Sequence, residues 1–275
     1  MNPQSRPERL FRYFPAAASD FFSTKKLWVS ALKDLNDPFD ALPRFDIMLE
    51  MQRQREIEAF GCPIPELERE SRDFCAEGNE AVAEKYRDLV NEGLRLVCFS
   101  EKVDELLMWG HYASSHKGFV IEFDPKHPLF LPDEFGPVDY PNSDERLAIE
   151  DAQQSHDDFR KILFRKSHDW IYEGEWRLVK TSNALRLGDR RDGKKLRYLE
   201  LPTDAVRALY FGWQIPTENR DELLHSLKTD EWQRQRVEVF IMRPHKIKYA
   251  VVPILWEQWR DKPNTFGAEL DRLVP

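Results

Sequence analysis

The chain has 275 residues, of which 41% are hydrophobic and 33% are charged, and its formal net charge is −8 at pH 7. These proportions predict a globular protein with enough apolar material for a core, and they exclude a disordered or low-complexity chain. The negative charge argues against broad coating of duplex nucleic acid, because phosphate neutralisation supplies most non-specific affinity.

Nothing in the sequence indicates a membrane or an export route. No apolar run approaches the roughly 20 residues that a spanning helix needs. The N-terminal residues MNPQSRPERLFRYF lack the apolar core of a signal peptide, so we expect a cytoplasmic protein. The three cysteines, Cys62, Cys75 and Cys98, cannot all pair with one another and lack CxxC spacing, which predicts reduced thiols.

The first third of the chain predicts two strands and a helical insertion. Residues 10–14, LFRYF, and 27–32, LWVSAL, have the apolar composition of strands. Asn36-Asp37-Pro38 ends the second with a strong turn signal, since Asx side chains cap local backbone and proline removes a donor. Residues 45–92 are helical in composition apart from a Gly-Pro break, and predict an insertion over the core.

The middle of the chain predicts strand, helix and strand in close succession. Ser100 follows the first of these strands and is predicted to cap the helix. Alternation in FVIEF places Phe119, Ile121 and Phe123 on one strand face. The predicted elements are a strand at 94–99, a helix at 104–116, a strand at 119–123, a proline-rich loop at 125–142 and a helix at 144–167.

The last third predicts mostly strands. Residues 186–197, RLGDRRDGKKLR, form a basic cluster that predicts either a solvated loop between strands or a contact surface for an acidic partner or nucleic acid. The other predicted elements are strands at 169–180, 196–201 and 205–211, a helix at 218–228, and a terminal hairpin of 237–242 with 246–252.

Strands and helices alternate irregularly, and no glycine-rich phosphate loop follows any strand. We therefore predict one α+β domain over residues 1–275, with an antiparallel-rich, possibly split sheet and a helical insertion at 45–92.

The predicted helix at 104–116 concentrates Trp109, His111, Tyr112, Ser114, Ser115 and His116. A helix that serves packing alone rarely carries such groups together. We therefore predict that it lines a ligand pocket.

The segment DWIYEGEWR carries the second group of candidates. On a strand, Glu173, Glu175 and Arg177 share one face. Two carboxylates so placed can hold a sugar hydroxyl, act on a nucleophile and stabilise an oxocarbenium-like cation. The competing interpretation is an exposed charge ladder in which Arg177 neutralises Glu175.

Arg12 and Tyr13 lie in the first predicted strand and Ser30 near the end of the second. Arg12 either extends to the surface or anchors a phosphate bidentately, and Ser30 either caps a helix or contacts a ligand. A metal site is not predicted, since His111 and His116 are five residues apart and HExxH is absent.

Three segments resemble a bacterial family known only as a domain of unknown function. They are LNDPFD (35–40), CFSE to VIEFD (98–124) and DWIYEGEWR (169–177), and the resemblance extends from about Arg12 to Gly212.

The order Arg12, Ser30, Glu173-Gly174-Glu175 is also similar to ADP-ribosyltransferases, which use a compact split sheet. The resemblance implies NAD as substrate, with Glu175 on the nicotinamide ribose and Arg12 on the pyrophosphate or ribose. It also implies that Trp109 or Tyr112 stacks on nicotinamide. The Ser-Thr-Ser pattern of part of that superfamily is missing, which weakens the role of Ser30.

Three functions follow as alternatives. The first is an NAD-consuming transferase or glycohydrolase, in a toxin or phage-defence system, with Glu175, Glu173 and His111 catalytic and a protein or nucleic acid acceptor. Its cofactor-binding residues are Arg12, Tyr13, Ser30, Asn36, Asp37, Trp109 and Tyr112. The second is a non-enzymatic nucleotide-binding or sensing module, and the third is a hydrolase or nuclease that uses His111 and His116.

Overall fold

The computed structural model describes residues 6–45, 81–131, 134–143, 145–149 and 156–261. Its main sheet contains β1 (Leu10–Phe14), β3 (Leu94–Ser100), β4 (Phe119–Phe123), β5 (Phe135–Pro137), β6 (Glu175–Thr181), β9 (Val206–Phe211), β10 (Glu238–Pro244) and β11 (Val251–Leu255). The strand order is β11-β10-β9-β4-β1-β3-β6-β5. Neighbours are antiparallel except for the parallel pair β9 and β10.

A second, antiparallel sheet has the order β2-β8-β7 and consists of β2 (Lys26–Trp28), β7 (Arg186–Asp189) and β8 (Lys195–Glu200). The α-helices with both ends described are α1 (Phe21–Thr24), α4 (Leu106–Tyr112), α5 (His156–Leu163), α6 (Thr217–Ser226), α7 (Asp230–Gln235) and α8 (Trp256–Asp261). Residues 81–93 are also helical. Short 3-10 helices are η1 (Ala16–Ala18), η2 (Leu32–Asp34), η4 (His168–Glu173), η5 (Ser182–Ala184) and η6 (Thr203–Ala205).

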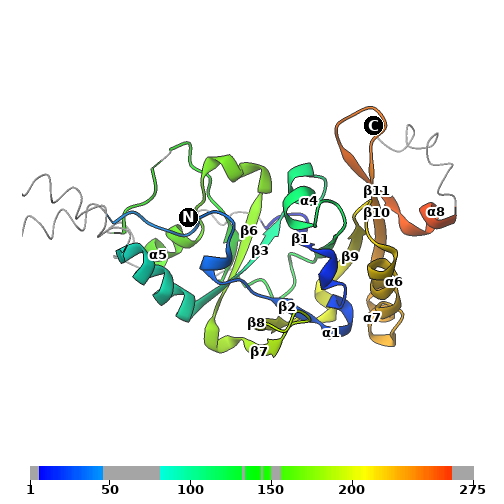
Figure 1. The fold of residues 1–275 in the computed structure, drawn as a ribbon, viewed down its shortest axis with the longest axis horizontal. Helices are drawn as coiled ribbons and strands as arrows, with labels where there is room; N and C mark the ends of the chain where they lie inside the picture. Colours follow the sequence, from blue (N-terminus) through cyan, green and yellow to red (C-terminus); the bar gives the residue numbers. More distant parts are fainter. Residues whose placement is uncertain (1–5, 46–80, 132–133, 144, 150–155, 262–275) are drawn as a thin grey trace, which may run out of the picture.

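The predicted α+β class with an antiparallel-rich sheet is confirmed. Strand alternation supplies both faces of the main sheet with apolar side chains. In β1, Leu10 and Phe14 belong to one core cluster, whereas Phe11 and Tyr13 belong to another. Side chains of α1, α6 and α7 join the first cluster, and those of α4 join the second. Helices lie on either side of the strands, with α6 and α7 beside β9 and β10 (Figure 1).

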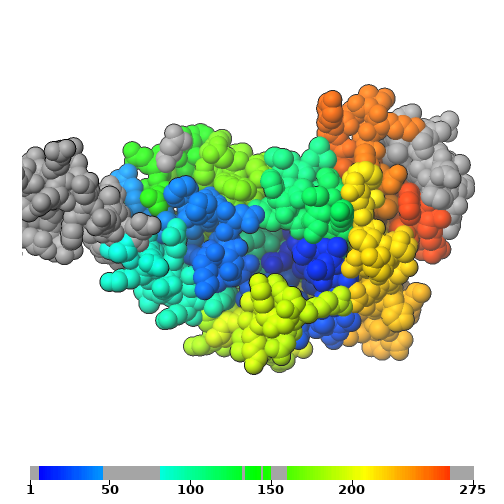
Figure 2. Space-filling view, viewed as in Figure 1, coloured from blue at the N-terminus to red at the C-terminus, as the bar shows by residue number. Residues whose placement is uncertain are grey.

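A third cluster connects Val90 of the helix at 81–93, Leu96 of β3 and Leu163 of α5. On the visible face, the blue N-terminal segment lies between green α4 and the yellow-green β7–β8 hairpin (Figure 2). Most of the predicted insertion at 45–92 falls on residues 46–80, which lie outside the described residues. Within the described part of the chain, no helix has the length and apolar character to cross a membrane.

The predicted strand at 27–32 is shorter than expected. β2 ends at Trp28, and Ser30 makes only an isolated bridge to Leu96 before η2 begins. Ala31, and not Ser30, occupies the N-cap position of η2. The capping role considered for Ser30 is therefore wrong.

The predicted helix at 104–116 also ends early. α4 stops at Tyr112, and Ser114, Ser115 and His116 then adopt positive φ of 49°, 54° and 64°. Its N-cap is Glu105, so the capping role predicted for Ser100 is wrong. Tight packing explains the early end, because the backbone returns so close to β1 that a Cβ on Gly118 would lie 2.0 Å from the carbonyl oxygen of Phe14.

The predicted strand at 169–180 is wrong in its first half, where residues 168–173 form η4. The side chain of Ser167 begins this turn by accepting a hydrogen bond from the backbone of Asp169. Gly174 ends it with a left-handed φ of 50°, which glycine adopts without steric cost, and β6 starts at Glu175. Glu173 therefore does not share a strand face with Glu175 and Arg177.

Several other boundaries differ. The predicted loop at 125–142 contains β5, and the basic stretch 186–197 forms most of the β7–β8 hairpin. In the predicted helix at 144–167, residues 145–149 are not α-helical, and Ala148 forms a bridge with Arg44. The terminal hairpin is present as β10 and β11, shifted along the chain from its predicted bounds.

Candidate functional site

A cavity of about 220 Å³ opens beside β1 and β3, and is also lined by residues of the 30–40 segment, α4 and η4. Most of the site residues predicted from the sequence line it, although they come from distant parts of the chain. They are Arg12, Tyr13, Ser30, Asn36, Tyr112, Glu173 and Glu175. Cys98, Ser100 and Lys166 line it as well.

The register of β3 and β6 explains why polar groups gather here. Glu175 lies opposite Ser100, and Arg177 lies opposite Cys98. Alternate residues of a strand point to the same face, and directly opposed side chains are near neighbours. The four side chains therefore meet on one side of the sheet.

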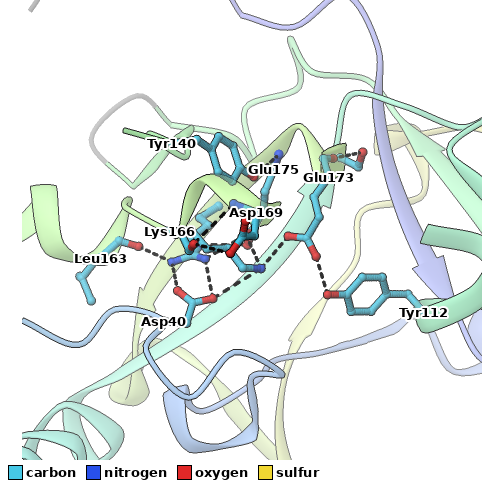
Figure 3. A network of polar contacts seen from close by, with 11 residues as sticks. Asp40, Tyr112, Tyr140, Leu163, Lys166, Asp169, Glu173 and Glu175 are labelled. Carbon is cyan, nitrogen blue, oxygen red and sulfur yellow. Dashed lines mark hydrogen bonds and ion pairs between the residues drawn. The ribbon is translucent and has the colours of Figure 1, made fainter. Parts of the chain in front are cut away.

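One wall of the cavity belongs to a buried ion cluster (Figure 3). Its members are Asp40, Lys166, Glu173, Glu175 and Arg177. Glu173 is 2% exposed, Glu175 5% and Arg177 0%. The exposed charge ladder considered as an alternative is therefore wrong.

Arg177 is the centre of this cluster. Its Nε and Nη2 donate to the two carboxylate oxygens of Glu175 at 2.8 and 2.9 Å. Its Nη2 also donates to Asp40 at 2.8 Å, and its Nη1 to the carbonyl oxygen of Leu163 at 2.7 Å. Such a two-pronged ion pair is among the stronger polar contacts in proteins. Glu175 is thus committed to Arg177.

Lys166 connects the remaining carboxylates. Its Nζ lies 2.6 Å from Glu173, 3.4 Å from Glu175 and 3.7 Å from Asp40. With all five side chains ionised, three carboxylates face two cations, so the cluster carries one surplus negative charge.

The two glutamates respond to this environment in opposite directions. Burial opposes ionisation of Glu175, but the ion pair with Arg177 outweighs it and lowers the pKa of Glu175 to about 2. Burial raises the pKa of Glu173 above its usual value, and the opposing effect of Lys166 is too small to cancel it. Glu173 is therefore the member that binds and releases a proton more readily.

Tyr112 holds Glu173 from the cavity side. Its hydroxyl donates to Oε1 of Glu173 at 2.5 Å (Figure 3). Burial raises the pKa of Tyr112, with the charge of Glu173 adding to the shift, so the phenol stays protonated. Asn36 lines the same cavity and opposes the rise in the pKa of Tyr112. The LNDPFD turn and α4 therefore meet at the cavity.

Arg12 brings a cation to the cavity on β1. Its Nη2 donates to the carbonyl oxygen of Trp28 at 2.9 Å and its Nη1 to that of Cys98 at 3.4 Å. These contacts to neutral carbonyls orient the guanidinium without neutralising it. Burial lowers the pKa of Arg12. A desolvated cation held in this way favours an anionic ligand.

Other lining residues hold the backbone around the cavity in place. The hydroxyl of Tyr13 donates to the carbonyl oxygen of Lys102 at 2.9 Å, and that of Ser100 to the carbonyl oxygen of Glu173 at 2.5 Å. Burial raises the pKa of the Cys98 thiol, so it remains protonated. The nearby thiol also helps to lower the pKa of Glu175.

Three predicted site residues lie elsewhere. Trp109 is 0% exposed and packs edge-on against Tyr13 in the core. Its indole nitrogen donates to the carbonyl oxygen of Val103 at 2.6 Å, so its polar group is satisfied inside the fold. His111 is exposed and lines neither cavity described here. Asp37 caps its own turn by accepting from the backbone of Phe39 at 2.9 Å, and it lines a larger neighbouring cavity.

Sequence reasoning did not propose Asp40, Lys166 or Cys98 as site residues. Asp40 belongs to the LNDPFD motif, which was interpreted through its Asn-Asp-Pro turn. Lys166 lay at the end of a predicted helix and had no distinguishing pattern. In the described part of the chain, no group of three or more His, Cys, Asp or Glu side chains is arranged to hold a metal ion.

Comparison with protein families adds one finding. Residues 108–178 match the family described as "Protein of unknown function (DUF2971)". The resemblance to a family of unknown function is thus confirmed over these residues, which include the MWGHYA and YEGEWR motifs, whereas the LNDPFD segment at 35–40 lies outside the match. No curated protein and no solved structure matches the chain. The DUF2971 region contributes Tyr112, Lys166, Glu173 and Glu175 to the cavity.

Proposed function

We propose that the smaller cavity binds the nicotinamide ribose of NAD and breaks its N-glycosidic bond. The protein would then be an NAD-dependent ADP-ribosyltransferase or NAD glycohydrolase. The observation that carries the proposal is the charge arrangement of the cavity. A buried cluster that has one surplus negative charge when all its side chains are ionised forms one wall, while Arg12 stands on β1 without a carboxylate contact among the described residues. NAD has the complementary distribution, with a cationic nicotinamide ring and an anionic diphosphate.

In the proposed reaction the bond between ribose C1′ and the nicotinamide nitrogen breaks, and its electron pair goes to that nitrogen. Neutral nicotinamide leaves, and the ribose becomes an oxocarbenium-like cation. Water or an acceptor nucleophile then adds to C1′ and loses a proton. Fixed negative charge beside the developing cation lowers the barrier, because it needs no solvent rearrangement.

We assign Glu173 the role of the carboxylate that stabilises the developing cation. It lines the cavity, and hydrogen bonds from Tyr112 and Lys166 favour its ionised form against the burial that raises its pKa. We assign Glu175 a positioning role in place of the predicted catalytic role, because bidentate hydrogen bonds from Arg177 hold its carboxylate. The cavity is below the roughly 300–1,000 Å³ of typical ligand pockets, which suits part of a dinucleotide better than all of it.

The test is NAD consumption by the purified protein, measured as nicotinamide release with and without cell extract as acceptor. Glu173→Gln removes the charge but keeps the shape, and we expect a loss of about 100-fold or more. Glu122→Gln is the matched control, because Glu122 pairs with Arg9 outside the cavity and should leave turnover unchanged.

A wild-type protein that releases no nicotinamide and labels no macromolecule under these conditions contradicts the proposal. Thermal stabilisation by NAD without turnover would instead support the non-enzymatic nucleotide-binding module.

A further inference from the structure

A second, larger cavity of about 470 Å³ lies next to the first and plays no part in the function proposed so far. Its lining residues come from three stretches of the chain: 37–43, 141–143 with 145–147, and 162–170. Backbone hydrogen bonds join the chain around these walls. Arg44 donates to Leu147 at 2.8 Å, and Asp139 donates to Phe164 at 2.7 Å. The cavity is therefore built into the fold, and its volume falls within the range of small-molecule sites.

The two cavities are one side chain apart. Lys166 lines both of them. Its Nζ lies 2.6 Å from Glu173, which lines the smaller cavity, and 4.6 Å from the ring centre of Trp170, which lines the larger. A molecule seated in the larger cavity would therefore lie close to the proposed reacting group.

The larger cavity offers aromatic surface and guanidinium groups. Phe39 is 60% exposed, and Trp170 is partly exposed on η4. The guanidinium of Arg146 lies 5.4 Å from the ring centre of Phe39. Arg165 pairs with Asp139 at 3.6 Å, and the Asp139 side chain is largely exposed, so a phosphate can replace it. Aromatic faces beside arginines are the usual chemistry for bases and phosphates.

Acidic groups also line this cavity, but each has an internal contact. Asp37 accepts from the backbone of Phe39 at 2.9 Å. Glu145 pairs with Arg44 at 2.8 Å, and Asp169 contacts the hydroxyl of Ser167 at 3.4 Å. Asp37 is buried, whereas the carboxylates of Glu145 and Asp169 stay exposed, so a phosphate is favoured at Arg165 and away from them.

We propose that the larger cavity binds the purine nucleotide half of the substrate, with the base on Phe39 or Trp170 and the phosphate near Arg165. This inference rests on the proposed function, because it assigns the second half of a dinucleotide whose reacting half occupies the smaller cavity.

Adenosine monophosphate tests this site, because it lacks nicotinamide and its bond to ribose. Isothermal titration should detect binding to the wild-type chain, and at least one of Trp170→Ala and Phe39→Ala should weaken it about tenfold, the usual scale for one base–aromatic stack. Ile171→Ala is the control for Trp170, since it truncates an exposed neighbour on η4 outside both cavities. Exposed Leu187 on β7 provides the control for Phe39. Tyr112→Phe should leave adenosine monophosphate affinity unchanged, because Tyr112 lines only the smaller cavity.

The outcomes separate the two proposals. Failure of adenosine monophosphate to bind, or equal affinity for the wild type and both cavity variants, overturns the nucleotide site. If NAD is consumed, Trp170→Ala or Phe39→Ala should raise KM for NAD about tenfold with little change in kcat, and a KM that is unchanged in both variants also overturns the site. Selective binding of adenosine monophosphate by a protein that never consumes NAD retains the site and rejects the proposed reaction.

Discussion

The guanidinium of Arg177 is buried, and its hydrogen bonds go to Glu175, Asp40 and the carbonyl oxygen of Leu163. Charges at this depth are tolerated only when they are paired and hydrogen-bonded. The cluster contains three carboxylates and two cations, so the loss of either cation leaves buried carboxylates without compensation. Loss of Arg177 would leave three carboxylates around Lys166 alone.

We expect Arg177→Met to lower the free energy of unfolding by about 3–5 kcal/mol, the usual range when one partner of a buried ion pair is removed. Urea denaturation measures this. Arg186→Met is the matched control, because Arg186 pairs with Glu200 at an exposed position and should cost at most about 1 kcal/mol. Equal effects of the two substitutions would contradict the central role of Arg177.

Tyr112 contributes to the protonation equilibrium of Glu173, after the larger effects of burial and Lys166. Its hydroxyl donates to the ionised carboxylate and so lowers the pKa of Glu173, although burial keeps the net shift upward. Tyr112→Phe should therefore raise the pKa of Glu173 further, as measured by carboxyl-carbon NMR during a pH titration. If the protein is active, the acidic limb of its pH–rate profile should move to higher pH as well.

Tyr13→Phe serves as the control for this titration. Tyr13 lines the same cavity, but its hydroxyl donates to the carbonyl of Lys102 and not to Glu173. A pKa of Glu173 that is the same in all three proteins would rule out the Tyr112 hydrogen bond as a cause.

At the scale of secondary structure, the change from η4 to β6 at Gly174 separates the two glutamates. The left-handed φ of 50° turns the chain so that Glu173 reaches Tyr112 and Lys166, while Glu175 reaches Arg177. A Cβ at Gly174 would also lie 2.9 Å from Cγ of Glu101. The turn therefore depends on glycine for its backbone angle and for space.

Gly174→Ala should lower the free energy of unfolding by about 1–2 kcal/mol from the left-handed backbone alone, with the contact to Glu101 adding to it. Urea denaturation of Gly193→Ala isolates the backbone part. Gly193 has a φ of 81° in the β7–β8 turn, and no atom within 4 Å of an added Cβ. A smaller effect at Gly174 than at Gly193 would show that Glu101 does not constrain the turn.

At the scale of the whole molecule, the ion cluster joins the main sheet, the LNDPFD turn and η4, and it makes the free energy of unfolding depend on pH. The pKa of Glu175 is about 2 in the folded protein and 4.5 in its ordinary state. The unfolded chain therefore takes up the proton first on acidification, so this group contributes stability above pH 4.5 that is lost as pH falls toward about 2.

The wild-type protein should lose urea resistance across that window more steeply than Glu175→Gln, which lacks the titrating group. Glu173 contributes with the opposite sign, since its folded pKa is raised and protonation favours the folded state. Comparison of the two proteins at each pH isolates Glu175, and parallel pH profiles would contradict its assigned pKa.

Local pattern was sufficient for much of the fold. The apolar run LFRYF and the alternation in FVIEF correctly predicted β1 and β4, which contribute apolar side chains to core clusters on both faces of the main sheet. The α+β class followed from the irregular mixture of short strands and helices. The concentration of polar groups in MWGHYA and YEGEWR also indicated segments that reach the cavity, including Tyr112, Glu173 and Glu175.

Only the tertiary structure assigned partners to these groups. Arg177 meets Asp40 across 137 residues of chain, and the contact depends on sheet order and strand register, which no local pattern encodes. In the sequence, Trp109 could not be distinguished from a residue that stacks on a ligand. The fold buries it in the core, where it packs edge-on against Tyr13. The different environments of Glu173 and Glu175 arise at a single left-handed glycine, because the turn there lets Glu175 reach Arg177 as well as Lys166, whereas Glu173 pairs with Lys166.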